Sequence, residues 1–266
     1  MATRVVWITD PHFNFLSNEA LAEFVAPLAA DPPAAVLIGG DIGEADSVAD
    51  YLQILERALT CPVYFVLGNH DFYGGSIRRV RAAVTELAAD AERLGYLTAT
   101  DVVKLAEDVA LVGHDGWADG RLGDYENSDV MLNDYRLIQE LASVDKVRRL
   151  PLLQQLGDEA ADHLRRTLTA ALEDHPRAFV LTHVPPLREA CWHEGRLSND
   201  EWLPHFTCQA AGEALLEVAG QFPDRQVTVL CGHTHSRGEV WPLANLQILT
   251  GAAEYRQVAV EKVFEL

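Results

Sequence analysis

The stretch RVVWITDPH (residues 4–12) is a short β-rich run that ends in Asp10 and His12. Similar apolar runs, each bounded by charged residues, Gly or Pro, recur at residues 35–39, 63–68, 109–113, 178–182, 227–231 and 258–264. Runs this short are typical of buried strands. Apolar stripes at helical spacing lie between several of them, within residues 21–28, 48–59, 77–94 and 164–172. Strand alternating with helix predicts an α/β layered domain with a largely parallel region.

The rest of the chain fits one domain built around this alternation. Residues 240–249 and 257–266 are strand-like with no helix between them, which predicts an antiparallel edge. Two polar and aromatic segments, near residues 116–156 and 187–207, interrupt the pattern. Long segments inserted in a compact domain are often pocket walls. We therefore expect a single domain over residues 1–266 whose two insertions line a pocket.

Composition and charge narrow the classes of function. The chain has 266 residues, 48% of them apolar, with 21 Lys and Arg against 40 Asp and Glu, a net charge of −19. Such a surface repels nucleic acids and anionic membranes, so stable binding to either is not expected. There is no apolar run long enough for a membrane span and no signal-peptide pattern. The four cysteines lack metal-binding spacing, which favours free thiols in a cytoplasmic protein.

Metal-ligand residue types follow five of the predicted strands. They are Asp10 and His12, Asp41, Asn69 with His70 and Asp71, His183, and finally His233 and His235. Ligands of α/β sheets collect at the carboxyl ends of strands, so neighbouring strands would bring these side chains to one rim. The glycines before Asp41, Asn69 and His233 suit tight exits from a strand.

Carboxylate, amide and imidazole groups without thiolate suit divalent ions such as Mn²⁺, Fe²⁺ or Zn²⁺. Seven ligand residues exceed what one tetrahedral ion takes, and two ions would need a bridging ligand, which Asp41 can be because it has two oxygens. The charge of two divalent cations exceeds that of the Asp10 and Asp41 carboxylates. The net positive charge that is left would hold an anionic phosphoryl group. The neutral Asn69 preserves that net positive charge.

The ordered series D-x-H, G-D, G-N-H-D, H and G-H-x-H, from Asp10 to His235, resembles the calcineurin-like metallophosphoesterases. The resemblance implies a four-layer αββα sandwich, in which helices flank two central mixed sheets. It implies one metal on Asp10, His12, Asp41 and His235, and a second on Asp41, Asn69, His183 and His233. It further implies a bridging hydroxide as nucleophile, and His70 near the leaving group, oriented through Asp71 or the local backbone. Asn69 and His70 would also contact the substrate.

Other readings stay open beside this one. A non-catalytic metal-binding scaffold with the same fold is the alternative function, although scaffold relatives would be expected to have lost motif histidines. A mononuclear zinc hydrolase is a third possibility. The substrate is expected to be a small phosphomonoester or phosphodiester, with a nucleotide-like compound among the candidates. Arg188 is the first candidate to bind the substrate phosphate through paired hydrogen bonds, followed by Arg121 and Arg136.

The second insertion carries His193 and His205 together with Trp192 and Trp202. These rings would form an aromatic wall for a nucleobase or pack the loop, and packing is the favoured reading.

Overall fold

Two mixed β-sheets form the centre of the molecule, in a computed structural model that describes residues 3–266. The first sheet has the strand order β13 (Lys262–Glu265), β1 (Arg4–Ile8), β2 (Ala35–Gly39), β3 (Val63–Val66) and β4 (Leu94–Tyr96). The second has the order β11 (Gly238–Leu243), β12 (Leu246–Thr250), β10 (Gln226–Cys231), β7 (Arg177–Thr182), β6 (Val109–His114) and β5 (Val103–Ala106). Strands β1 to β4 run parallel, as do β12, β10, β7 and β6, while β13, β11 and β5 pair antiparallel.

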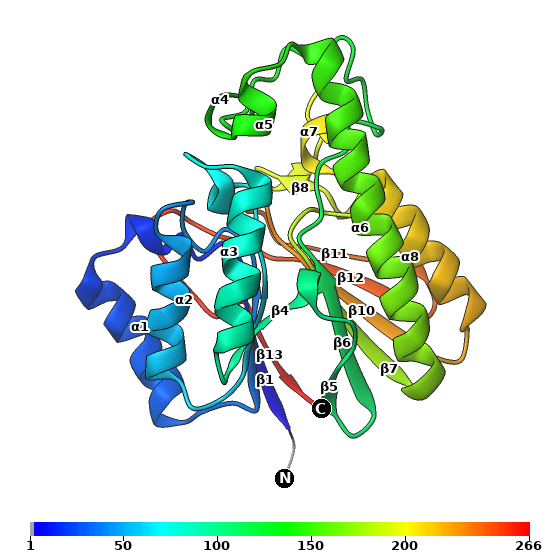
Figure 1. Cartoon of the computed structure of the whole chain (residues 1–266). Helices are drawn as coiled ribbons and strands as arrows, with labels where there is room; N and C mark the ends of the chain where they lie inside the picture. The colour runs from blue at the N-terminus through cyan, green and yellow to red at the C-terminus, as the bar shows by residue number, and fades with distance from the viewer. Residues whose placement is uncertain (1–2) are drawn as a thin grey trace.

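Helices cover the outer face of each sheet (Figure 1). On the first sheet these are α1 (Asn18–Ala30), α2 (Val48–Ala58) and α3 (Ile77–Asp90), and on the second they are α6 (Lys146–Asp174) and α8 (Gln209–Gln221). The result is the four-layer αββα sandwich that the family resemblance implied. The expectation of a largely parallel α/β domain with antiparallel C-terminal strands is confirmed.

The strands are apolar on both faces because each sheet has two apolar neighbours. In β1, Val5 and Trp7 pack in the layer between the two sheets, where they meet residues such as Leu111. The alternate residues Val6 and Ile8 pack beneath the helices of the first sheet. This alternation of side chains between two buried faces explains why the sequence shows short continuous apolar runs instead of an apolar–polar alternation.

Three boundaries differ from the sequence expectations. Leu94 belongs to β4 and not to the preceding helix, because α3 ends at Asp90. Helix α6 begins at Lys146, so the end of the first insertion is helical. The last strand begins at Lys262, and residues 251–261 form a loop apart from an isolated bridge between Glu254 and Gln257.

Short elements fill the insertions and strand exits. The short helices are α4 (Asp134–Leu137), α5 (Gln139–Ala142) and α7 (Leu203–Phe206), and the small hairpin pairs β8 (Trp192–His193) with β9 (Arg196–Leu197). Single 3-10 turns lie at η1 (Phe13–Phe15), η2 (His70–Phe72), η3 (Leu97–Ala99) and η4 (Arg188–Ala190). Within residues 3–266, every helix falls short of the length or the apolarity that a membrane span requires.

A buried carboxylate, Asp115, joins the two sheets where β6 ends. It accepts hydrogen bonds from the Leu67 amide at the end of β3 (2.8 Å) and from the hydroxyls of Tyr96 and Thr98 (both 2.7 Å). It also forms an ion pair with Arg81 of α3 at 2.8 Å. Burial raises the pKa of Asp115, but the Arg81 charge and the hydrogen bonds outweigh burial and hold the pKa below its usual value. Asp115 therefore stays ionised and ties the second sheet to the first.

Candidate active site

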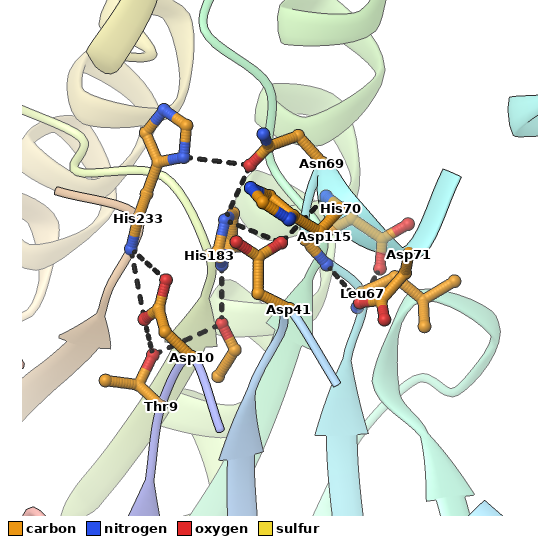
Figure 2. Close-up of polar contacts among 12 residues, drawn as sticks. Thr9, Asp10, Asp41, Leu67, Asn69, His70, Asp71, Asp115, His183 and His233 are labelled. Carbon is orange, nitrogen blue, oxygen red and sulfur yellow. Dashed lines mark hydrogen bonds and ion pairs between the residues drawn. The ribbon is translucent and has the colours of Figure 1, made fainter. Parts of the chain in front are cut away.

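The seven predicted ligand residues converge at one rim of the two sheets (Figure 2 labels five of them). Three strands of the first sheet supply Asp10 and His12, Asp41, and Asn69, and two strands of the second supply His183, and His233 with His235. All seven follow the carboxyl ends of parallel strands, which is where ligands of α/β sheets collect.

The first group of donor atoms belongs to Asp10, His12, Asp41 and His235. One donor atom from each of these residues lies within 4.8 Å of all the others. The two imidazole Nε2 atoms of His12 and His235 are 3.1 Å apart. Nε2 of His235 lies 3.4 Å from Asp10 Oδ1, and Nε2 of His12 lies 3.7 Å from Asp41 Oδ2. Two imidazoles and two carboxylates are a donor set suited to a divalent transition ion.

The second group is centred on the amide oxygen of Asn69. Nδ1 of His183 donates to the Gly39 carbonyl at 2.8 Å, and Nε2 of His233 donates to the His205 carbonyl at 3.3 Å. These hydrogen bonds fix the tautomers, so the other nitrogen of each ring presents a lone pair. Nε2 of His183 lies 3.1 Å from Asn69 Oδ1, and Nδ1 of His233 lies 2.9 Å from it. This amide oxygen is itself an acceptor.

This convergence of lone pairs is the test of whether a cation fits. Acceptors that face one another repel unless a cation lies between them. Two ligands of an ion with bonds near 2.1 Å lie about 3 Å apart when they are at right angles. Asp41 lies between the groups, because its Oδ2 faces His12 and its Oδ1 is 3.4 Å from His183 Nε2. The residues present thus fit two neighbouring cations that share Asp41.

The backbone at these residues is held in a rarely used conformation. Asp10, His12, Asp41, His233 and His235 all have positive φ, between 43° and 69°. Non-glycine residues avoid this region, and its use at functional sites reflects constraint by the surrounding structure. The predicted tight exits are confirmed, since a Cβ on Gly68 would overlap Asp41 Oδ1 and one on Gly232 would overlap Asp10 Oδ2.

The two buried carboxylates differ in the direction of their pKa shifts. Burial raises the pKa of Asp41 well above its usual value, and the nearby charge of Asp10 raises it further. Burial acts on Asp10 in the same sense, but the hydrogen bond and charge of His235 and the charge of His183 lower its pKa below the usual value. Burial therefore disfavours the charged form of Asp41, and a cation beside it would favour that form.

His70 and Asp71 differ in what they contact. The His70 amide donates to Asp41 Oδ1 at 2.9 Å, and its ring lies 4.6 Å from that of His12. Among residues 3–266, Nδ1 of His70 has no hydrogen-bond partner. Asp71 Oδ1 accepts from the amides of Ile42 and Gly43, and its Oδ2 accepts from that of Gly68. These bonds hold two ligand-bearing loops together, so the contacts of Asp71 favour positioning over a direct role in the reaction.

A buried polar triad that the sequence did not reveal orients Asn69. Oδ1 of Asp134 accepts from Asn69 Nδ2 at 2.9 Å and from the Tyr73 hydroxyl at 2.7 Å, while that hydroxyl accepts from Asn69 Nδ2 at 2.9 Å. The amide nitrogen is therefore engaged on one side, and the amide oxygen faces His183 and His233. No motif marks Asp134, because it lies in the first insertion, away from any strand end.

The Asp134→Ala protein should bind the divalent cation that the family resemblance assigns to Asn69 about 10- to 100-fold more weakly, because the Asn69 amide would then keep only its bond to the Tyr73 hydroxyl. Calorimetric titration with Mn²⁺ measures this loss. The matched control, Tyr73→Phe, keeps the bond from Asn69 to Asp134 and should change the affinity far less. Equal Mn²⁺ affinities in the Asp134→Ala and wild-type proteins would contradict the orienting role.

A cavity of about 270 Å³ opens in front of both donor groups. It is lined by Asp41, Asn69, His70, Tyr73, Leu132, Asn133, Asp134, His193, Phe206, His233, Thr234, His235 and Tyr255. Tyr255, from the loop before β13, packs its half-exposed ring 4.7 Å from His12 and 5.1 Å from His235. Both Tyr255 and Asp134 are wall residues that sequence patterns did not indicate.

The arginines proposed from the sequence lie outside this cavity's lining. Arg188 forms an exposed ion pair with Asp200 at 2.6 Å, and Arg121 pairs with Asp119 and Asp158. Arg136 is exposed and is not among the lining residues. Phosphate contact by Arg188 therefore gains no support from the geometry and stays a prediction.

Comparison with known proteins agrees with the site. Residues 3–237 match the model of the calcineurin-like phosphoesterase family. A probable cyclic nucleotide phosphodiesterase of Pseudoalteromonas sp. (strain SM9913) is 30% identical over 103 residues, a segment that spans 31% of this chain and 40% of that relative.

Solved structures of low identity share the fold. The phosphopantetheinyl hydrolase of Mycobacterium tuberculosis has a TM-score of 0.60 at 16% identity, covering 96% of this chain and 92% of its own. A dimetal phosphatase of Danio rerio has a TM-score of 0.59 at 15% identity, and the match covers 95% of this chain and 88% of that protein's chain. With the family model matched over nearly the whole chain and its ligand motifs gathered at one rim, the chain belongs to the calcineurin-like phosphoesterase family.

Proposed function

We propose that this protein hydrolyses a small phosphate ester, a phosphomonoester or a phosphodiester, at a pair of divalent cations. The observation that carries the proposal is the convergence of two donor groups on Asp41 at the floor of one cavity. Asp10, His12, Asp41 and His235 would hold one cation, and Asp41, Asn69, His183 and His233 the other. Mn²⁺, Fe²⁺ and Zn²⁺ all suit these donors.

Two such cations would polarise the phosphoryl oxygens and lower the pKa of water. The protein's own contribution is to hold the donors and to keep the site positive. Asp10 and Asp41 are the only carboxylates in the proposed ligand sets, and Asn69 is neutral. With two divalent cations bound, the site would therefore keep a net positive charge that attracts an anionic phosphoryl group, although the net charge of the whole protein is −19.

His70 is placed to contact the substrate beside the cations. Burial lowers the pKa of His70 to about 4, with a further lowering by the charge of His183, so the ring is neutral at pH 7. A neutral imidazole offers one N–H donor, which would stabilise charge developing on a phosphoryl or leaving-group oxygen. The hydrogen bond from its backbone amide to Asp41 holds the His70 loop beside a residue that would ligate both cations.

The residues that line the cavity limit how many phosphate groups a substrate can carry there. The 13 residues that line the cavity include neither Arg nor Lys. The charge of a bound ester would thus be met mainly by the cations, which favours a compound with a single phosphate. We propose that residues of both insertions, among them Asp134 and Phe206, form the walls that select the organic group. The name of the Pseudoalteromonas relative makes a nucleotide diester a reasonable candidate.

The four buried free cysteines support a reducing compartment, and we place the protein in the cytoplasm.

Hydrolysis of bis(p-nitrophenyl) phosphate and of p-nitrophenyl phosphate tests the proposal. After dialysis against EDTA, the protein should release p-nitrophenolate only when Mn²⁺, Fe²⁺ or Zn²⁺ is added back, with two equivalents of metal per chain at saturation. The Asn69→Ala protein serves as the control for contaminating phosphatases. A wild-type rate no higher than that of Asn69→Ala with every metal would reject catalysis and favour a scaffold.

A further inference from the structure

The second insertion builds an aromatic surface that begins at a proposed metal ligand. The Phe206 ring meets the His233 ring edge-on, with centroids 5.3 Å apart at 87°. Trp202 stacks on Phe206 at 5.2 Å and 28°, and His193 lies 5.6 Å from Trp202 at 34°. These three side chains, Phe206, Trp202 and His193, are called the aromatic wall below.

The aromatic wall runs from the metal-facing cavity into a second one. His193 lines both cavities, Phe206 lines the first, and Trp202 lines the second, which has a volume of about 200 Å³. The hairpin of β8 and β9 forms the far side of the second cavity through Glu194, Arg196 and Leu197. A group attached to a phosphate at the cations could therefore extend along the aromatic wall.

The aromatic wall is held rigidly against the metal ligand. His205, beside Phe206 in α7, is buried and hydrogen-bonds through both ring nitrogens, to Ser128 Oγ at 2.9 Å and to the Tyr135 hydroxyl at 2.6 Å. Its carbonyl accepts from Nε2 of His233. Hydrogen bonds thus join the two insertions, and they hold the aromatic wall at a fixed position relative to His233.

The chemistry of the two cavities selects an uncharged ring. Arg196 is the one cationic side chain among the residues lining either cavity, and it lies 3.5 Å from Glu194. A second phosphate would find little compensation there. Flat π-systems, by contrast, stack well on aromatic side chains. Nδ1 of His193 lies 3.3 Å from the Thr234 carbonyl; donation to that carbonyl leaves Nε2 as an acceptor for a ring N–H.

Trp192 has a different surrounding from Trp202. A Cβ placed on Gly238 would overlap the Trp192 ring, so Trp192 packs closely against the start of β11. Packing, the favoured expectation, therefore describes Trp192 and the buried His205, while His193 and Trp202 line a cavity.

We propose that Trp202, Phe206 and His193 form a subsite for a flat, uncharged aromatic group of the substrate, such as a nucleobase or an aryl ring. This inference rests on the proposed function, because it assumes that the ester phosphate binds at the cations. It identifies the substrate class as a singly phosphorylated ester of an aromatic or heteroaromatic compound.

Two diesters with the same p-nitrophenolate leaving group test the subsite: phenyl p-nitrophenyl phosphate and ethyl p-nitrophenyl phosphate. In the presence of Mn²⁺, Trp202→Ala should lower kcat/KM for the phenyl ester about tenfold, mainly through KM, and change the ethyl ester less than twofold. The matched control Trp241→Ala removes an exposed tryptophan of β11 and should leave both values unchanged. Equal losses on both esters, or no loss on either, would overturn the subsite.

A binding measurement keeps this test separate from catalysis. Adenosine, a neutral nucleoside, should quench tryptophan fluorescence of the protein in EDTA, and the Trp202→Phe protein should lose most of that quenching while retaining its melting temperature. If the wild type hydrolyses no ester but adenosine quenches through Trp202, the proposed hydrolysis fails and the subsite stands. Equal quenching in wild type and Trp202→Phe would reject the subsite even in an active enzyme.

Discussion

The Asp41→Asn protein is expected to bind one Mn²⁺ per chain tightly instead of two, and to hydrolyse bis(p-nitrophenyl) phosphate about 10³-fold more slowly than wild type, the loss expected when several kcal/mol of Lewis-acid stabilisation disappears. The reason lies in the two oxygens of Asp41. One faces His12 of the first donor group and the other faces His183 of the second. Asparagine has a single side-chain oxygen, so it can serve only one cation.

Equilibrium dialysis with Mn²⁺ and initial rates at saturating metal measure both parts of this prediction. Asp46→Asn is a matched control, because it removes an exposed carboxylate from the same loop and should alter neither value. Two tightly bound ions together with a near wild-type rate in Asp41→Asn would show that Asp41 is not shared. The site would then have to be redrawn with each cation on its own set of ligands.

The His70→Ala protein should keep both Mn²⁺ ions and lose about 10²-fold in kcat, at the lower end of what a positioned acid, base or hydrogen-bond donor contributes. His70 belongs to neither donor group, so metal stoichiometry should be unchanged. Because burial lowers the pKa of His70 to about 4, the ring is neutral throughout pH 6 to 8. The deficit of His70→Ala relative to wild type should therefore be the same at pH 6 and pH 8.

Two variants refine the role of His70. His70→Gln keeps an N–H donor near the same place and should recover part of the rate if hydrogen bonding is what His70 supplies. His175→Ala, at the C-terminal end of α6, controls for the loss of a half-buried histidine elsewhere. A deficit that appears only at low pH would instead mean that His70 acts as a protonated acid, with a pKa near neutrality.

The sequence was most informative where strands end. Asp10, Asn69 and His233 lie far apart in the chain, yet each follows a buried strand of a parallel region, and parallel strands place their carboxyl ends at a common edge. This rule predicted the convergence of all seven ligand residues without coordinates. The family resemblance predicted how the two sheets stack, which apolar periodicity alone did not.

Residues of the insertions and of the loop before β13 were beyond the same reasoning. Asp134 and His205 lie in four-residue helices and Tyr255 lies in that loop, and the positions of such short segments depend on tertiary contacts and not on helical or strand periodicity. Proximity in the chain was also a poor guide for Arg188, because the turn after His183 takes it to an exposed pair with Asp200. Such side chains are found only when the loops are placed relative to one another.

The hydrogen-bonded cluster around Asp115 has a consequence for how substrate preference can change. Asp115 fastens the end of β6 to Leu67 at the end of β3, with Arg81 of α3 reinforcing the joint. The contact between the two sheets is therefore held by residues outside both insertions. Segments of the insertions other than those that carry Asp134 and His205 can therefore vary in length and composition, and so admit new compounds, without disturbing this junction or the bonds to Asn69 and His233.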